Sequence, residues 1–148
     1  MSLDSIISLL SYIATTLFGA LMYYLIDKVK TRRRLSKGLI EELKTNAQIL
    51  RNQVDLLKKD KRPLYQLTRV YHAEVFHALR ITDPELYSKL LVKHPDLVEV
   101  YQELFYLNDL RYSAETAISR ENLIQRLKGL QSKIEALVKE IQETLKQN

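Results

Sequence analysis

The sequence contains no cysteine, and it has only three prolines and three glycines among 148 residues. Without cysteine the chain forms no disulfide and offers no thiolate for catalysis or metal binding, so redox conditions do not restrict its compartment. The glycines, at positions 19, 38 and 129, are isolated within helical patterns, which excludes a glycine-rich loop that could hold a phosphate. Few helix breakers and abundant Leu, Ile, Lys, Glu, Gln and Arg predict an all-α fold.

Residue patterns for catalysis are also missing. No serine lies in a Gly-x-Ser-x-Gly elbow, and the acidic residues are spread along helix faces that we expect to be solvated. Glu74 and His77 have the Glu-x-x-His spacing of carboxylate-bridged di-iron bundles, but such a site needs a second pair and two further glutamates. His72 and His77 are about 140° apart around a helix and share no face. We therefore expect no enzyme, and no catalytic residue, cofactor, metal site or small-molecule substrate.

An uncharged apolar run from Ser5 to Ile26 is the feature around which the chain is organised. As a helix, these 22 residues are about 33 Å long, enough to cross a hydrocarbon core of about 30 Å. A secretory signal peptide is the alternative. Signal peptides carry positive charge before a shorter apolar core, whereas the charged residue before this run is the acidic Asp4. The sequence therefore predicts a transmembrane anchor over residues 1–27.

Basic side chains follow the apolar run at once, in a juxtamembrane segment over residues 28–37. They are Lys28, Lys30, Arg32, Arg33, Arg34 and Lys37. Residues 27–37 have a net charge of +5, while residues 1–26 contribute −1 and residues 38–148 contribute +1. This position predicts an N-terminus outside and a C-terminal domain in the cytoplasm, or on the equivalent inner face of a viral membrane. Contact with anionic lipid explains the excess charge without nucleic acid.

Small side chains recur along the predicted anchor at spacings of three and four, which places them on one helix face. They are Ser8, Ser11, Thr15 and Gly19. Such a stripe allows a second helix to approach closely within a membrane. In the alternative interpretation, each hydroxyl bonds the carbonyl four residues earlier and has no partner helix. Both interpretations remain open at this point.

Two heptad-like stripes predict that residues 38–148 form a helical bundle or hairpin. Their seam residues are Ile40, Leu43, Leu50, Val54, Leu57, Leu127, Leu130, Ile134, Leu137 and Ile141. Ala47 continues the first stripe but weakens it as a seam between two chains. We expect the two stripes to pack antiparallel within one chain, as coiled-coil-like segments. A two-stranded coil between copies is the alternative.

The middle of the chain is divided by its three prolines. Pro63 ends a charged turn, after which we expect a helix over residues 64–81. Asp83 followed by Pro84 is typical of a helix start, with a capping side chain before proline in the first turn. Pro95 marks the next boundary.

The last third of the chain, residues 96–147, contains Gly129 as its only helix breaker. We expect one long helix here, with a fray or kink near Ser119 as the alternative. Eight tyrosines and phenylalanines lie between residues 65 and 112. Their helical spacing favours a role in the core, whereas an aromatic surface for a partner protein is the alternative.

These patterns together predict one transmembrane helix that continues into a cytoplasmic antiparallel helical hairpin or bundle. The expected function is structural: a single-pass scaffolding or adaptor protein that acts through helix–helix association, in a membrane complex or a virion membrane. Its expected partners are membrane lipid and either a second copy, in a homo-oligomer, or another membrane protein. The alternative function is binding of anionic lipid or nucleic acid through the basic segment. A metal protein centred on Glu74 and His77 is the least favoured hypothesis.

Overall fold

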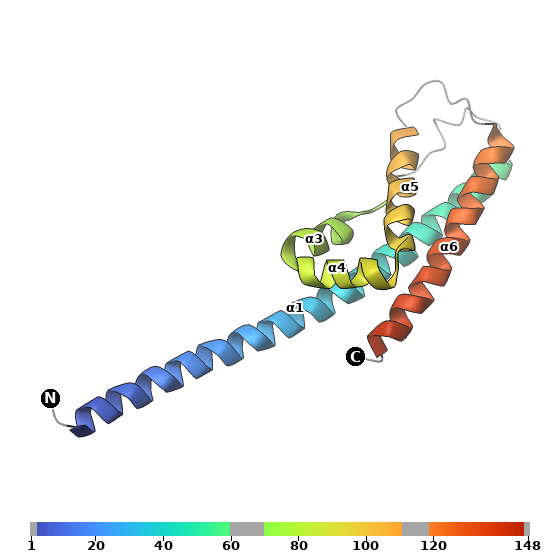
Figure 1. The fold of residues 1–148 in the computed structure, drawn as a ribbon. Coiled ribbons are helices and arrows are strands. Elements are labelled where there is room, and N and C mark those ends of the chain that lie inside the picture. Colours follow the sequence, from blue (N-terminus) through green and yellow to red (C-terminus); the bar gives the residue numbers. More distant parts are fainter. Residues whose placement is uncertain (1–2, 60–69, 111–118, 147–148) are drawn as a thin grey trace. The chain divides into compact units, whose positions relative to one another are not determined.

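A computed structural model describes residues 3–59, 70–110 and 119–146, and within these ranges the chain forms five α-helices and no strand (Figure 1). Contacts divide the chain into two units, Met1–Leu35 and Ser36–Asn148. The all-helical prediction is therefore confirmed for the part of the chain that the structure describes.

The first unit consists of the N-terminal part of helix α1, which spans Leu3–Lys59. The absence of proline before position 63 allows this helix to continue without interruption. Every side chain from Ser5 to Ile26 is exposed, and none of the most apolar window is buried within the described structure. By length and composition this helix is able to cross a membrane, a test that an N-terminal signal sequence also passes.

The second unit has an apolar core to which five helices contribute side chains. Its most deeply buried apolar side chains are Leu39, Leu43, Leu50, Leu57, Leu79, Leu97, Tyr101, Leu104, Leu127, Ile134 and Ile141. Along each of the longer helices these positions are spaced by three, four or seven residues, so they lie on one apolar face, and burial of those faces stabilises the unit. Core formation thus follows from the same periodicity that predicts the helices.

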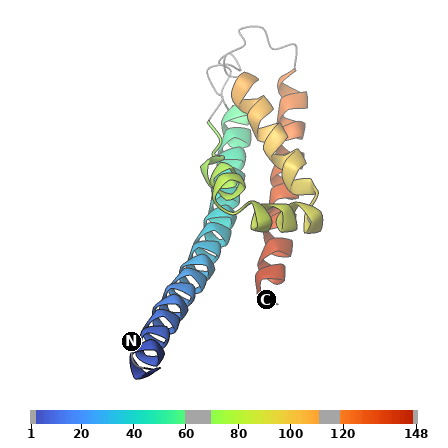
Figure 2. The ribbon, with the colours of Figure 1, turned by 60° about the vertical axis from the view of Figure 1, so that its left-hand side comes forward.

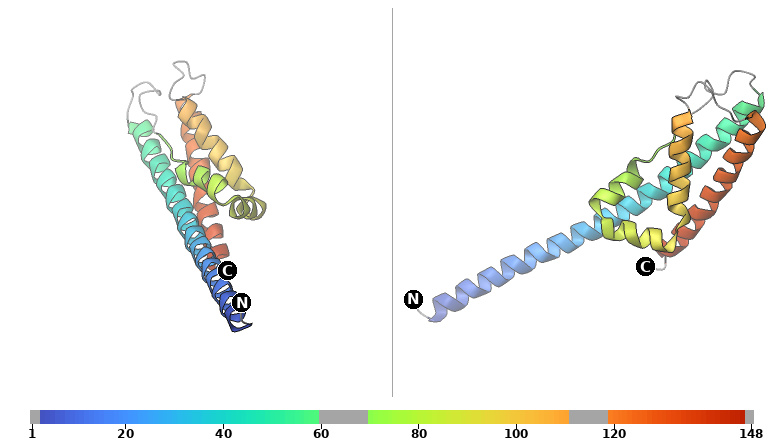
Figure 3. Two further views of the ribbon diagram at one scale, coloured as in Figure 1. Left: turned by 90° about the vertical axis from the view of Figure 1, so that its left-hand side faces the viewer. Right: turned by 45° about the horizontal axis from the view of Figure 1, so that its top comes forward.

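Helix α6, which spans Arg120–Lys146, lies alongside the C-terminal part of α1 within the second unit (Figures 2 and 3). The Arg120 guanidinium donates a hydrogen bond to the Leu57 carbonyl, with 2.9 Å between Nη1 and O. Further along, Arg51 forms an ion pair with Glu135, with 3.1 Å between Nη2 and Oε1. From the first contact to the second, the residue number decreases on α1 and increases on α6. These contacts therefore link helices that run in opposite directions.

Helix α5 spans Asp96–Leu110 and packs on α6. Its Glu99 carboxylate lies 2.6 Å from the Lys133 ammonium. In one straight helix these two residues would be about 51 Å apart, so the expectation of a single helix over residues 96–147 is wrong. The alternative placed an irregularity near Ser119, and Ser119 is not helical. Residues 111–118 lie outside the described ranges.

Two short helices connect α1 to α5. Helix α3 spans Glu74–Thr82, and helix α4 spans Pro84–Lys93. The Asp83 side chain accepts a hydrogen bond of 3.0 Å from the Leu86 amide, so the predicted start of α4 at this cap is confirmed.

The predicted helix over residues 64–81 is confirmed from Glu74 onward and is wrong just before it. Residues 64–69 lie outside the described ranges, and Val70 to Ala73 are not helical. The helix begins at Glu74 because the preceding backbone groups are bonded to side chains of other helices. Those side chains belong to Asn46 and Asn108.

Candidate functional site

The predicted basic segment belongs to helix α1, where its side chains differ in exposure. Lys30, Arg33 and Arg34 are exposed, and their spacing of three and one places them on one helix face. Lys37 is exposed as well, whereas the other two members, Lys28 and Arg32, are half-buried: their exposure is intermediate. The exposed face therefore presents cations immediately after the apolar run.

The predicted small-residue stripe in the anchor, formed by Ser8, Ser11, Thr15 and Gly19, lies on the fully exposed part of α1. The Thr15 hydroxyl donates a hydrogen bond of 2.8 Å to the Ser11 carbonyl, as the alternative interpretation of the hydroxyls requires. A Cβ added at Gly19 would meet no atom within 4 Å in the described structure. A packing role for this stripe stays a prediction.

All ten predicted seam residues are buried in the second unit. On α1 they share their burial with Ala47, which is 8% exposed. The pairwise register across α1 and α6, and hence the coiled-coil character of the seam, stays a prediction.

A cluster of polar side chains holds the backbone of residues 71–76 against α1 and α5. We call it the polar clamp, and its members are Glu42, Asn46, Gln53, Tyr101 and Asn108. Asn46 and Gln53 are 0% and 2% exposed, so these amides depend entirely on protein partners. Three of the five members come from α1.

Two asparagines each bind both backbone groups of one of two consecutive residues, in the way a neighbouring strand would. Asn46 on α1 accepts a hydrogen bond from the His72 amide (2.8 Å) and donates one to the His72 carbonyl (2.7 Å). Asn108 on α5 does the same for Tyr71, at 2.8 Å and 3.1 Å. All four backbone groups are thus satisfied without secondary structure, and this explains why the segment is not helical.

The buried Glu42 carboxylate caps helix α3 from a different helix. It accepts hydrogen bonds from the amides of Val75 (2.7 Å) and Phe76 (3.2 Å) and from the Tyr101 hydroxyl (2.5 Å). The local N-cap position is Ala73, which has no polar side chain to do this. A carboxylate at a helix N-terminus also interacts favourably with the helix dipole.

Two tyrosines close the clamp from the side of the core. The Tyr71 hydroxyl donates to the Gln53 carbonyl oxygen at 2.6 Å, and the Tyr101 ring stacks on Phe76 with 3.9 Å between ring centroids. Burial raises the pKa of Tyr71, and burial together with the Glu42 carboxylate raises the pKa of Tyr101. Both hydroxyls therefore remain protonated donors well into alkaline conditions.

Gly38 allows α3 to approach α1 next to the clamp. A Cβ added at this glycine would lie 3.2 Å from Cγ1 of Val75, closer than most real contacts. The glycine that weakens α1 by up to about 1 kcal/mol relative to alanine therefore has a packing role.

The three histidines do not converge on a metal site. His77 stacks on Phe105 with 5.4 Å between ring centroids, and Nδ1 of His72 lies 3.5 Å from Oε2 of Glu74. His94 is buried where α4 ends, with Nε2 3.3 Å from the Thr144 hydroxyl. Within the described ranges, no three His, Asp or Glu side chains gather as metal ligands would.

The polar clamp was not predicted from the sequence. The expectation that the acidic residues lie on solvated helix faces is wrong for Glu42, since this residue is only 7% exposed. A signal was present: Glu42, Asn46 and Gln53 are spaced by four and seven, which forms a row beside the apolar stripe. A polar row adjoining a core face is equally typical of a solvated face, so the spacing alone could not identify the partners.

The clamp holds the backbone of residues 71–76 in position, and its polar groups are bonded to one another and to these residues.

Comparisons of the chain with protein-family models, with curated proteins and with solved structures find no match.

Proposed function

We propose that this protein is a single-pass membrane-anchored scaffold or adaptor, which acts through association of its helices. One observation carries the proposal: the apolar side chains from Ile6 to Val29 are all exposed, whereas those of the second unit form a core. A lipid bilayer is the solvent that makes such an exposed apolar helix stable.

The energetics of the apolar run support insertion. Ten Leu, Ile and Phe residues lie between Ser5 and Ile26, with no charged residue among them. At roughly 0.3 to 0.6 kcal/mol each, they favour a membrane position by about 3 to 6 kcal/mol. The serines, threonines and glycine of the run offset part of this, and hydroxyls bonded to the helix backbone, as in Thr15, reduce that cost.

The proposed topology places the N-terminus outside and the second unit in the cytoplasm, or on the inner face of a viral membrane. Its support is the basic segment, since cytoplasmic flanks of membrane helices are enriched in Lys and Arg. The exposed face formed by Lys30, Arg33 and Arg34 suits contact with anionic headgroups.

In this proposal the second unit is the part that associates with a partner. The α1 and α6 stripes would act as coiled-coil-like segments of an antiparallel hairpin, with α3, α4 and α5 packed onto it. The partner is a second copy or another membrane protein. The small-residue stripe of the anchor offers a further contact within the bilayer.

The absence of native cysteine allows a direct test of anchoring and topology. Ser2→Cys and Lys93→Cys would be made separately in the full-length chain and treated in intact cells with a membrane-impermeant maleimide. We expect labelling of the first variant in intact cells and of the second only after lysis. The cysteine-free parent is the background control.

Three outcomes would contradict the proposal. Labelling of both sites, or of Lys93→Cys alone, would overturn the topology. Extraction of the chain from membranes by alkaline carbonate would overturn the anchor. A mature protein shortened by about the length of the apolar run, detected by intact mass, would assign that run to a cleaved signal peptide.

A second candidate function is binding of anionic lipid by the basic segment. Its support is that Lys30, Arg33 and Arg34 share an exposed face. In nanodiscs that contain phosphatidylserine, we expect enrichment of this lipid around the chain and loss of the enrichment when the three residues are changed to Gln. Tight, strongly salt-dependent binding of a labelled DNA duplex by the unmodified chain, lost in the same variant, would favour nucleic acid instead.

A further inference from the structure

A solvent-exposed groove runs between α1 and α6 in the second unit. Its volume is about 330 Å³, and Ala47 of α1 and Val138 of α6 lie among its lining residues. These two side chains are 8% and 7% exposed, so they form the floor. The groove extends over two turns of each helix, from Lys44 to Arg51 and from Glu135 to Gln142, or about 10 Å along each helix axis.

Small side chains create this groove. In the α1 stripe from Ile40 to Leu57, Ala47 is the one member that is not Leu, Ile or Val. A single methyl group there leaves the space that a larger side chain would fill. Two helices side by side with a row of space between them accept the side-chain ridge of a third helix.

The groove walls carry an excess of positive charge. Lys44, Arg51 and Lys139 line it, against the single carboxylate of Glu135. That carboxylate is already engaged: it accepts a hydrogen bond of 2.9 Å from Gln131 and pairs with Arg51. The Gln131 hydrogen bond, with a smaller contribution from Arg51, lowers the pKa of Glu135. These four residues give the walls a net charge of +2 at neutral pH. Lys44 also pairs with Glu41 outside the lining, at 2.9 Å, so the net charge is +1 when Glu41 is counted.

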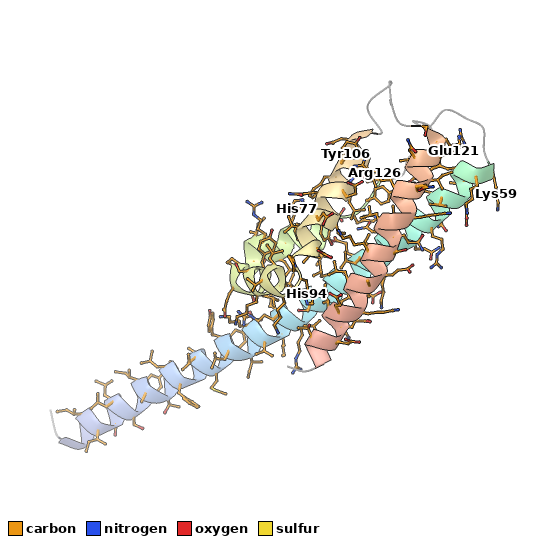
Figure 4. The ribbon with its side chains drawn as sticks, turned by 45° about the vertical axis from the view of Figure 1, so that its right-hand side comes forward. Lys59, His77, His94, Tyr106, Glu121 and Arg126 are labelled. Atoms are coloured by element: carbon orange, nitrogen blue, oxygen red, sulfur yellow. The ribbon has the colours of Figure 1, made fainter. Side chains whose placement is uncertain are left out.

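A second groove, between α5 and α6, provides a contrast. Its walls contain Glu99 and Glu103 on α5 and Arg126 and Lys133 on α6, which pair across the two helices. Arg126 also lies over the Tyr106 ring, 4.2 Å from its centroid (Figure 4). The charges of this groove balance, so it does not select a charged partner.

We propose that the α1–α6 groove is the docking site for an acidic amphipathic helix of a partner protein. Apolar side chains of that helix would pack over Ala47 and Val138, and flanking Asp or Glu side chains would face Lys44 and Lys139. A groove-to-groove contact between two copies of this chain is disfavoured, because two surfaces of the same positive charge repel each other. The proposal deepens the adaptor function and rests on it, since it names the partner class.

The test uses two synthetic probes and the full-length chain in neutral phosphatidylcholine nanodiscs. One fluorescein-labelled helical peptide of three heptads has Leu at alternating three- and four-residue spacing and Glu at the flanking positions. The matched peptide has the same Leu positions and Lys in place of Glu. We expect saturable binding of the acidic peptide by fluorescence anisotropy, about tenfold or more tighter than that of the basic peptide and weaker as salt is raised.

Three variants locate the binding. Ala47→Leu should fill the groove, and Lys44→Glu combined with Lys139→Glu should reverse its charge; each should weaken acidic-peptide binding by about tenfold or more. Lys93→Glu reverses an exposed charge on α4, away from the groove lining, and should leave binding unchanged. Near-ultraviolet circular dichroism of the tyrosines checks that each variant is folded.

Absence of acidic-peptide binding, or binding unaffected by both groove variants, would overturn the proposal. So would a dimer of the full-length chain, seen by light scattering, that Ala47→Leu abolishes, because the occupant would then be a second copy. These results are separable from failure of the proposed function. Cysteine labelling tests the anchor independently of the groove.

Discussion

Two adjacent rows of side chains on the same helix are buried by different means. On α1, the apolar seam row includes Leu43 and Leu50, both 0% exposed, and the polar row includes Asn46 and Gln53, at 0% and 2%. The seam row is buried among other apolar side chains, whereas the polar row is buried against backbone groups and hydroxyls that it must match atom by atom. Burial alone therefore does not describe what a row contributes.

The difference lies in directionality. Apolar burial is proportional to area and tolerates repacking, so the seam favours association of helices without fixing their details. Displacing the partner of a buried amide or carboxylate destabilises the fold, because the polar group is left without a hydrogen bond. The polar row therefore holds residues 71–76 in one position. We infer that the seam supplies stability and the polar clamp supplies specificity. The four predictions that follow test this division.

The largest effect is expected from truncating the seam. Leu50→Ala should lower the free energy of unfolding by about 4 kcal/mol, because a fully buried leucine leaves a cavity. Urea unfolding of the full-length chain in mild detergent, followed by near-ultraviolet circular dichroism of the tyrosines, measures this. Leu21→Ala, at an exposed position of the first unit, is the matched control and should leave the transition unchanged. A loss below about 1 kcal/mol for Leu50→Ala would remove the seam from its stabilising role.

Removing the carboxylate of the clamp should have the next largest effect. Glu42→Ala leaves the Val75 and Phe76 amides and the Tyr101 hydroxyl without their acceptor, at a cost of about 3 kcal/mol. Glu42→Gln retains one acceptor oxygen and should cost less. Hydrogen exchange at the two amides should accelerate in Glu42→Ala before the seam is affected. Equal exchange rates in the parent and the variant would contradict the capping role.

A smaller effect is expected at Asn46, where donor and acceptor can be separated. Asn46→Ala removes both hydrogen bonds to His72 and should cost about 2 kcal/mol. Asn46→Asp keeps the acceptor for the His72 amide and loses the donor to its carbonyl, so that amide should stay protected from exchange. If Asn46→Asp exposed the amide as much as Asn46→Ala does, recognition of the peptide unit would not explain the clamp.

The smallest effect at neutral pH is expected from Tyr101 of the clamp and from Tyr71, which donates to the clamp residue Gln53. This effect grows as the pH rises. Burial raises the pKa of Tyr71 and Tyr101 above the ordinary value of about 10 in an unfolded chain. Their contribution to stability is complete below pH 10 and is lost as the pH rises toward the folded-state values. Tyrosinate absorbance should show two groups that ionise only with unfolding, and one fewer in Tyr101→Phe. Ionisation of all tyrosines before unfolding would contradict this.

Local features of the fold could be predicted from the sequence. Asp83 with Pro84 identified the start of α4, the lack of proline identified the uninterrupted α1, and the apolar stripes identified residues that the structure buries. These signals depend on neighbours within one or two turns, which a sequence displays directly.

Features that depend on distant partners could not be predicted. Asn46 meets His72 across 26 positions and Glu42 meets Tyr101 across 59, so no local pattern reports these hydrogen bonds. The reversal between α5 and α6 was missed for a related reason: Gly129 was the only evident breaker after residue 96, and it lies inside α6. Periodicity indicates which face of a helix is buried, but it does not identify the residues that cover this face.

Recognition of backbone by the clamp has a consequence for how this protein tolerates sequence change. His72 is exposed and Ala73 half-exposed, and His72 joins the clamp through its main-chain amide and carbonyl, which every residue except proline has. These two positions should therefore drift freely among homologues and accept most residues in a saturation library. Asn46, Asn108 and Glu42 should resist replacement. The conformation of the segment therefore depends on the identity of residues far from it in the chain.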